Sequence, residues 1–332
     1  MSLFSGKAVS LWGIGMHVPE RILTNQELEQ MVDTSNEWIL ERTGIRERHI
    51  VAPEKQTSDL AVEAGRIALE RAGLAPEELD MVIVATNSPD TIFPCTAAKV
   101  QGKLGAKKAG AFDVQSGCTG CVYALTVAVS GIAAGVWRHV LVIGAEALSR
   151  LINWQDRNTC VLFGDGAGAC VLGPRREGDG RFIAASLRAD GTKHDLISLP
   201  AGGSERPASK ETLEEGAHFV HMKGNEVFKF VNRELPPFLQ SFCESSGVEP
   251  GHVDWWIFHQ ANWRIMDGIL RRFGVSPERA VVNLDRYGNT SAASVFLALC
   301  EALDDGRIRK GQKMVINSFG AGMTYGAILL EV

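Results

Sequence analysis

The chain has 332 residues, of which 45% are hydrophobic, and a formal net charge of -5 at pH 7. This length and composition predict a folded protein with a large core and exclude an intrinsically disordered chain. The net negative charge gives no overall reason to bind nucleic acid, so we expect no nucleic-acid partner, and an anionic ligand needs a specific pocket.

Several features of the sequence bear on where in the cell the protein is found. The opening MSLFSGKAVSLWGIG lacks the charged segment, apolar run and cleavage site of a signal peptide. The seven cysteines are scattered and form no disulfide framework, which favours a reducing, cytoplasmic compartment. The uncharged stretch 114–137 is long enough to cross a bilayer. Its many Gly, Ser and Thr residues favour a closely packed buried helix instead, so we expect no membrane span.

Apolar runs of strand type alternate along the chain with helical patterns, which favours an α/β fold with strands buried on both faces. The clearest predicted strands have the sequences MVIVATN, AGAFDVQ, HVLVIGAE, WWIFHQ and KMVINSFGAG. The predicted helices cover residues 58–72, the segment after Cys118, and residues 231–246, 260–273 and 291–303.

The two halves of the chain repeat one pattern. GLAPEELDMVIVATN from Gly73 is similar to GVEPGHVDWWIFHQAN from Gly247. A helix, a strand, a small-residue helix and a last strand then follow in the same order in both halves, at an offset of about 170 residues, which indicates an internal duplication. We therefore expect two halves: residues 1–173, which carry the nucleophile, and residues 174–332, which carry its partners.

Residues 112–121, FDVQSGCTGC, place Cys118 and Cys121 in a CxxC spacing at the predicted start of a helix. The pair could be a redox couple, half of a metal site, or one nucleophile with a neighbour that packs. The redox reading is weakened because CTGC lacks the usual Pro, and the metal reading because no second CxxC or close His pair completes four ligands. We favour Cys118 as a nucleophile whose thiol pKa the helix start lowers, with Cys121 packed one turn on.

Two further residues are candidates for the active site only when they are considered together with Cys118. His259 ends an apolar strand, where a single His is more often structural, and Asn289 in YGNTSAAS by itself would be a helix cap. In a duplicated α/β fold, however, the two helix starts and this strand end converge near one site, because ligands bind beyond the carboxyl ends of the strands. The coincidence makes all three candidates for an active site.

Five motifs, DTSNEWILERTGIRERHI, FGDGAGA, GNEVFK, HQANWRI and YGNTSAAS, occur in this order. Their order and spacing resemble those of the β-ketoacyl-acyl-carrier-protein synthase III family, the condensing enzymes of the thiolase superfamily that start type II fatty-acid synthesis. The resemblance covers essentially the whole chain. It implies a thiolase-like fold with internally duplicated αβαβα layers, in agreement with the repeat.

The resemblance implies that Cys118 takes an acyl group from an acyl-CoA starter, with acetyl-CoA the expected one. A decarboxylative Claisen condensation with malonyl-acyl carrier protein follows through the acyl-cysteine. His259 and Asn289 complete the triad and stabilise the charge that develops on the malonyl thioester oxygen. The backbone N–H groups of Cys118 and Ala321 are the implied oxyanion hole. Acyl-CoA and malonyl-carrier protein are substrates, and neither a cofactor nor a metal is expected.

The resemblance also assigns binding residues and a homodimer in which Phe93 closes the acyl pocket of the partner subunit. The implied CoA-binding residues are Thr34, Trp38, Arg42, Arg157, Asn225 and Phe228; those for acyl carrier protein are Arg264, Arg271 and Arg272; those of the acyl pocket are Phe93 and Met323.

Two departures from the family pattern bear on the starter. Here GCTGC and GAGMTYG stand where the family commonly has Ala-Cys-Ala-Gly-Phe and Gly-Gly-Gly-Phe-Thr-Trp-Gly, so that Cys121 and Met323 replace aromatic rings. A flexible Met changes the shape of a pocket. A biosynthetic thiolase would need a second cysteine in the C-terminal turn, which FGAGM lacks. The main alternative is a related acyltransferase or condensing enzyme of secondary metabolism with the same triad. Two alternatives come from other functional classes: a thiol oxidoreductase and a noncatalytic CoA-binding protein.

Overall fold

The computed structural model describes residues 2–332, with side chains from Phe4 onward. The strands are β1 (Ser2–Leu3), β2 (Val9–His17), β3 (Arg21–Thr24), β4 (Glu47–Ile50), β5 (Met81–Ala85), β6 (Gly110–Val114), β7 (Val140–Glu146), β8 (Gly166–Pro174), β9 (Arg181–Ala189), β10 (Ile197–Ser198), β11 (His221–Met222), β12 (Trp255–Phe258), β13 (Ala280–Val281), β14 (Lys313–Gly320) and β15 (Thr324–Glu331). The α-helices are α1 (Asn25–Glu29), α2 (Asn36–Thr43), α3 (Thr57–Ala72), α4 (Thr96–Leu104), α5 (Gly120–Ala133), α6 (Arg157–Cys160), α7 (Lys210–Glu214), α8 (Gly224–Ser245), α9 (Trp263–Arg272), α10 (Leu284–Tyr287) and α11 (Ser294–Asp304).

The same strand order occurs in both large sheets. One sheet runs β2-β8-β7-β5-β6, and the other runs β9-β15-β14-β12-β13 with β1 added at its edge. In the first, β5 pairs in parallel with β6 and β7; in the second, β12 pairs in parallel with β13 and β14. The predicted duplicated α/β fold is therefore confirmed. The division between residues 173 and 174 lies at the last residue of β8, and it stays a prediction.

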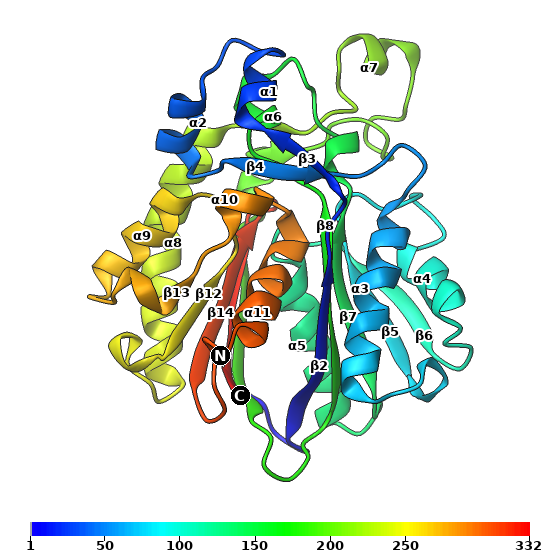
Figure 1. Cartoon of the computed structure of the whole chain (residues 1–332), viewed down its shortest axis with the longest axis vertical. Coiled ribbons are helices and arrows are strands. Elements are labelled where there is room, and N and C mark those ends of the chain that lie inside the picture. The colour runs from blue at the N-terminus through cyan, green and yellow to red at the C-terminus, as the bar shows by residue number, and fades with distance from the viewer. Residues whose placement is uncertain (1) are drawn as a thin grey trace.

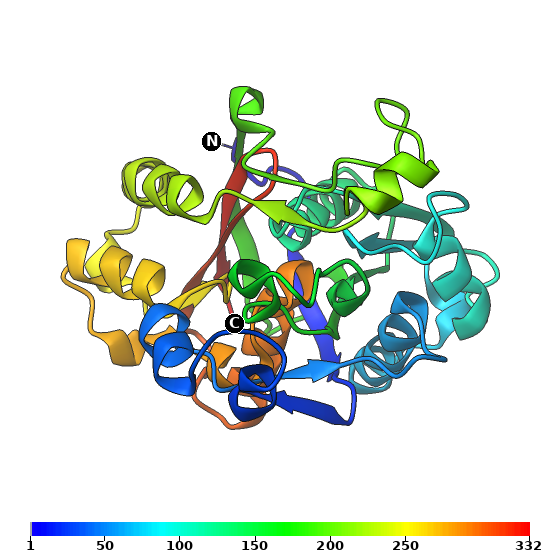
Figure 2. The same cartoon turned by 90° about the horizontal axis from the view of Figure 1, so that it is seen from above.

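The helices and sheets are stacked in layers, and the apolar faces of each element decide which elements pack together. Helices α5 and α11 are apolar nearly all round and lie between the two sheets, where residues from both helices and both sheets form one core cluster. Helices α3 and α4 cover the outer face of the first sheet, and α8 and α9 that of the second (Figure 1). A cap made by β3, β4, α1, α2 and α6 lies over one end of both sheets (Figure 2).

Several element boundaries differ from those predicted. Helix α8 begins at Gly224 instead of residue 231, because Val227, Phe230 and Val231 extend its buried face at helical spacing. The predicted helix 291–303 is a 3-10 turn followed by α11, and the predicted helix 260–273 begins at Trp263. The uncharged stretch 114–137 contains only the 14 residues of α5 as helix. Within residues 2–332, no helix is long and apolar enough to cross a bilayer.

Candidate active site

A cavity of about 850 Å³ opens where the two halves and the cap meet. Cys118, His259 and Asn289 all line it. They come from the loop before α5, the end of β12 and the turn before α11, so the predicted convergence of these three residues is confirmed.

Two glycines allow close contact between the Cys118 loop and the turn after β14. Gly117 has a left-handed φ of 56°, and a Cβ placed on it would lie 2.4 Å from the backbone N of Ala321. A Cβ on Gly320 would lie 2.3 Å from the backbone N of Cys118. Both contacts are far inside van der Waals distance, so the two backbone amides can face one cavity only because side chains are missing here.

The thiol of Cys118 is less acidic than its place before a helix suggests. Burial raises the pKa of Cys118 to about 12, while a hydrogen bond donated by the Ser291 hydroxyl over 3.2 Å acts in the opposite direction. The expected lowering of the pKa is therefore wrong, because the cost of burying a thiolate exceeds the benefit of the hydrogen bonds to the sulfur. Cys121 is fully buried in the core between the sheets, which confirms that it packs.

His259 is held as a neutral imidazole. Burial lowers its pKa to about 3, so the ring carries no charge at neutral pH. The Nδ1 atom lies 2.7 Å from the Ser294 hydroxyl, and the ring meets Phe319 edge-on at 5.4 Å between centroids. Because a serine hydroxyl either donates or accepts, Ser294 can serve both tautomers of this ring.

Asn289 has a fixed amide orientation. Its Oδ1 accepts a hydrogen bond from the backbone N–H of Ser291 over 2.9 Å. Its backbone N–H donates to the Leu162 carbonyl, and its own carbonyl accepts from Gly164, which ties the turn to the FGD segment. With Oδ1 occupied, the Nδ2 group is the part of the side chain that can donate into the cavity.

Cations and rings surround the mouth of the cavity. Trp38 and Arg42 line it, and the guanidinium of Arg42 lies 5.9 Å from the Trp38 ring centroid. The guanidinium of Arg157 lies 5.2 Å from the same centroid, although Arg157 itself is not part of the cavity wall. Such cation–π pairs present a flat, positively charged surface. Asn225 and Phe228 also line the wall, and the guanidinium of Arg264 lies 5.6 Å from the Phe228 ring centroid.

Other predicted residues lie away from this cavity. Thr34 is half-buried and does not line it. Phe93 is 84% exposed on the loop before α4. Met323 is fully buried in the core beneath α8 and α9 and does not form the wall, so its place in the acyl pocket stays a prediction. The exposed side chains of Arg271 and Arg272 lie at the end of α9, where Arg271 pairs with Asp267 at 2.9 Å.

Several polar residues at the site were not predicted from the sequence. Ser291 contacts the nucleophile and Ser294 contacts His259, although both belong to the YGNTSAAS motif from which only Asn289 was chosen. Asn87 also lines the cavity and hydrogen-bonds to Glu146, which is fully buried. The rule that selected His259 could have found Asn87, because β5 is the counterpart of β12 in the repeat and Asn87 follows its carboxyl end. Among residues 2–332, no group of three or more His, Cys, Asp or Glu residues is arranged to hold a metal ion.

Comparison with known proteins gives the same family for both halves. Residues 112–191 match the family model of 3-oxoacyl-[acyl-carrier-protein (ACP)] synthase III, and residues 243–332 match the model of its C-terminal part. A β-ketoacyl-[acyl-carrier-protein] synthase III of Symbiobacterium thermophilum is 52% identical over 98% of each chain. The crystal structure of 3-oxoacyl-[acyl-carrier-protein] synthase III from Aquifex aeolicus is similar with a TM-score of 0.89 and 41% identity, over 98% of this chain and 100% of that one. The priming β-ketosynthase of the R1128 polyketide pathway has the same TM-score at 33% identity, over 100% of this chain and 98% of that one.

Proposed function

The chain belongs to the β-ketoacyl-[acyl-carrier-protein] synthase III family of condensing acyltransferases, and on this premise we propose that Cys118, His259 and Asn289 carry out its reaction. The observation that supports this most directly is that the three side chains, drawn from both halves, line one cavity. The proposed reaction joins an acyl group from acyl-CoA to malonyl-acyl carrier protein, with release of CO₂.

In the first half-reaction, the Cys118 sulfur attacks the thioester carbonyl of acyl-CoA. Cys118 rests as a thiol, and its proton passes to neutral His259 in the same cavity wall as the sulfur–carbon bond forms. The carbonyl oxygen becomes an oxyanion, held by the N–H groups of Cys118 and Ala321, which the two glycines bring together. The C–S bond to CoA breaks, and the CoA thiolate leaves with the proton from His259.

In the second half-reaction, malonyl-carrier protein replaces CoA and loses CO₂. The electron pair of the broken C–C bond moves onto the thioester enolate, whose oxygen accepts hydrogen bonds from His259 Nε2 and Asn289 Nδ2. The carbanion carbon attacks the acyl-Cys118 carbonyl and a C–C bond forms. The C–S bond to Cys118 then breaks, and the Cys118 thiolate takes up a proton from the solvent. This half needs the Nε2–H tautomer, which the Ser294 hydroxyl supports by donating to Nδ1.

The mouth of the cavity fits the nucleotide end of CoA. Trp38 offers an aromatic face for the adenine, and Arg42 and Arg157 beside it offer guanidinium groups for phosphates. Asn225 and Phe228 line the same cavity and would contact the pantetheine arm. Thr34 lies outside the cavity wall, so its role in CoA binding stays a prediction.

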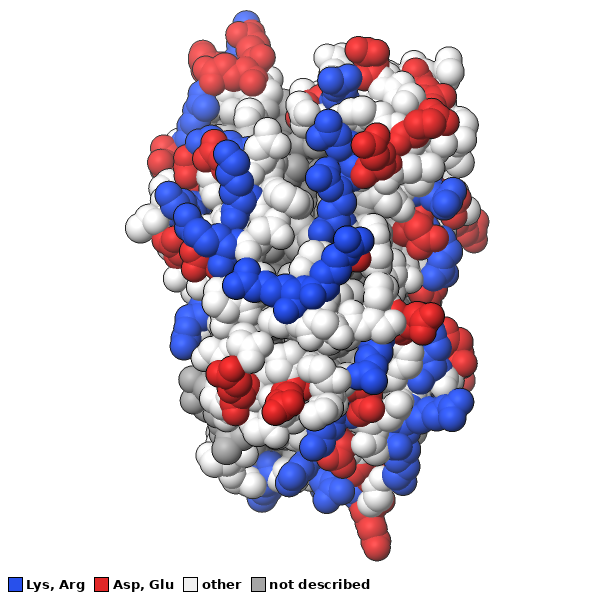
Figure 3. All heavy atoms as spheres, turned by 90° about the vertical axis from the view of Figure 1, so that its left-hand side faces the viewer, with Lys and Arg blue, Asp and Glu red and all other residues white. Residues whose placement is uncertain are grey.

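The acyl carrier protein is proposed to dock on the face formed by α2, α8 and α9. Figure 3 shows lysine and arginine side chains gathered around a hollow on this side of the molecule. Arg264, Arg271 and Arg272 are exposed on α9, and Arg264 also lines the cavity. An acidic carrier protein would be steered to such a rim even though the whole chain is net negative.

We further propose a homodimer that places Phe93 against the partner subunit. Ile92 and Phe93 are 78% and 84% exposed on neighbouring positions of one loop, an apolar pair that gains from being covered.

All seven cysteines are free thiols, which supports the proposal of a cytoplasmic location.

The proposed function is tested by asking which acyl-CoA starters the protein condenses with malonyl-acyl carrier protein. A panel of acyl-CoA starters is incubated with malonyl-acyl carrier protein, and product formation is followed by mass spectrometry. We expect product with acetyl-CoA, loss of product in Cys118→Ser, and retained activity in the matched variant Cys121→Ala. If no starter gives product, the result would favour the alternative, a condensing enzyme of secondary metabolism. The similarity to the R1128 priming ketosynthase is consistent with that alternative. Equal loss in Cys121→Ala would instead point to a dithiol reaction.

A further inference from the structure

Ser291 has an unusual backbone conformation beside the nucleophile. Among residues 2–332 it is the only non-glycine residue with a positive φ, at 46°. An L-residue adopts this region at a cost in free energy, so the surroundings must impose it. The Asn289 side chain accepts the Ser291 N–H over 2.9 Å, and α11 begins three residues later. The conformation points the Ser291 side chain toward Cys118.

The hydroxyl of Ser291 has a defined direction. Its Oγ lies 3.2 Å from Cys118 Sγ and 3.1 Å from Asn87 Nδ2. The Asn87 amide can only donate through Nδ2, so Ser291 Oγ accepts there. The single hydroxyl proton of Ser291 then points to the sulfur of Cys118, and the Glu146 carboxyl group is the other acceptor beside it.

The Asn87 amide is itself fixed from behind by Glu146. Nδ2 of Asn87 donates its other hydrogen to the Glu146 carboxyl group over 2.8 Å, and the backbone N–H of Asn87 donates to the same group over 3.1 Å. Glu146 also accepts from the Ser88 hydroxyl over 2.6 Å. Both hydrogens of the Asn87 amide are therefore used, and this amide cannot turn without breaking a buried hydrogen bond.

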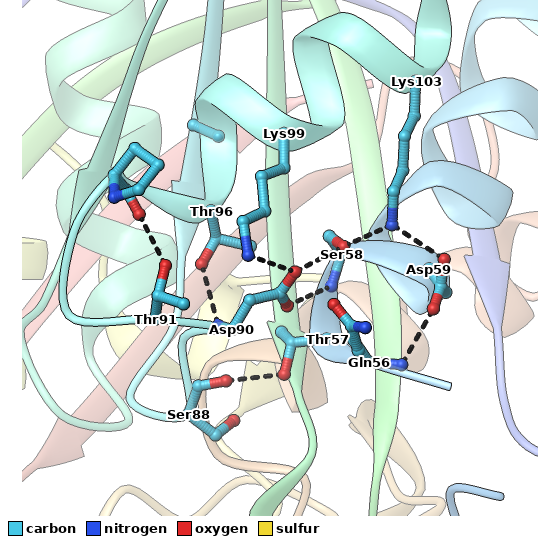
Figure 4. A network of polar contacts seen from close by, with 12 residues as sticks. Gln56, Thr57, Ser58, Asp59, Ser88, Asp90, Thr91, Thr96, Lys99 and Lys103 are labelled. Carbon is cyan, nitrogen blue, oxygen red and sulfur yellow. Dashed lines mark hydrogen bonds and ion pairs between the residues drawn. The ribbon is translucent and has the colours of Figure 1, made fainter. Parts of the chain in front are cut away.

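The segment that carries Asn87 is also anchored on its far side (Figure 4). The Thr57 hydroxyl donates to the Ser88 carbonyl over 2.6 Å. The buried Asp90 carboxylate accepts from the backbone N–H and the hydroxyl of Ser58, at the start of α3, and pairs with Lys99 of α4 at 3.4 Å. The chain after β5 is thus tied to two helices, which gives Asn87 a rigid base.

We propose that Ser291 is a further catalytic residue, whose hydroxyl, oriented by Asn87 and Glu146, donates a hydrogen bond that stabilises the Cys118 thiolate. The inference rests on the proposed function, because it takes Cys118 as the nucleophile. The hydrogen bond acts when the sulfur attacks acyl-CoA, and again when the sulfur leaves the acyl-enzyme as a thiolate. Besides Ser291, the ionisable groups near the sulfur are His259 in the same wall, Glu146 behind Asn87, and Cys121 on α5.

The test measures the rate at which iodoacetamide alkylates Cys118, mapped by mass spectrometry between about pH 7 and pH 9, where the thiolate is the reactive form. Ser291→Ala removes the hydroxyl and keeps the backbone strain, whereas Ser291→Gly removes both. We expect both variants to react about tenfold more slowly than the unmodified chain at every pH, because a hydrogen bond to a charged group is lost. Ser130→Ala, at an exposed position of the central helix α5, is the matched control and should react at the original rate.

Each outcome has a distinct meaning. If Ser291→Gly reacts normally and Ser291→Ala slowly, the backbone and not the hydroxyl matters, and the proposal is overturned. If both variants react at the original rate, it is overturned as well, while Cys118 remains the proposed nucleophile. If Cys118 of the unmodified chain is not alkylated before the buried cysteines and protected by acetyl-CoA, the proposed function fails first. Should Ser291→Ala not fold, Ser291→Gly, whose glycine suits the left-handed backbone, carries the test.

Discussion

Replacing Gly320 by alanine should damage the oxyanion hole while leaving the fold in place. A Cβ at this position would lie 2.3 Å from the backbone N of Cys118, whereas ordinary van der Waals contact begins at 3.4 Å. The turn after β14 must therefore retreat by about 1 Å, a displacement that is enough to cost on the order of a hundredfold in rate when it separates a donor from the reacting atoms. The backbone of Gly320 is not left-handed, so the effect is purely steric.

Self-acylation of Cys118 by acetyl-CoA, followed by intact-protein mass spectrometry, reports this step without the carrier protein. We expect a slower acylation rate for Gly320→Ala and a melting temperature within a few degrees of the original, since about 1 kcal/mol moves the midpoint of a chain this size by only a few degrees. Gly102→Ala is the matched control, because nothing lies within 4 Å of a Cβ at that helical position. A folded Gly320→Ala protein that acylates at the original rate would refute the assignment of the oxyanion hole to these two amides.

Three further predictions concern other parts of the site. Ser294→Ala should lower the kcat of condensation about tenfold, because the buried Nδ1 of His259 loses its partner at 2.7 Å. Arg264→Ala should raise the KM for malonyl-carrier protein roughly threefold to tenfold and weaken its salt dependence, with kcat little changed, since a rim charge acts mainly on association. The alkylation rate of Cys118 should rise about tenfold per pH unit up to pH 10, because a thiol with a pKa of about 12 gains thiolate steadily as protons are removed.

Controls separate these effects from general damage. Arg307→Ala removes a partly exposed arginine that pairs with Asp305 in the loop after α11, and it should leave the KM for the carrier protein unchanged. A KM that rises equally in Arg307→Ala would show a general charge effect and not docking at Arg264. Normal kcat in Ser294→Ala would mean that His259 keeps its orientation without this hydroxyl. A plateau in the alkylation rate near neutral pH would mean that the thiol of Cys118 is far more acidic than its burial implies.

Much of the architecture could be predicted because it depends on local, periodic patterns of apolar residues in the sequence. Alternating apolar runs and small-residue helices predict buried strands and central helices, and their repetition predicts the duplication that the matching strand orders of the two sheets confirm. The same repeat, together with the rule for strand ends, was enough to bring Cys118, His259 and Asn289 into one candidate site. The five motifs gave the family that the comparisons establish over nearly the whole chain.

The acidity of Cys118 and the role of Ser291 could not be predicted in this way. A helix start is visible in the sequence, but the burial that raises the pKa of Cys118 depends on segments far apart in the chain that surround the sulfur. The contact between Asn87 and Ser291 joins residues 204 positions apart, one from each half. Local sequence patterns place Cys118, His259 and Asn289 near strand ends and helix starts. Which side chains then form hydrogen bonds depends on how the two halves dock, because hydrogen bonds require distances that no periodic pattern encodes.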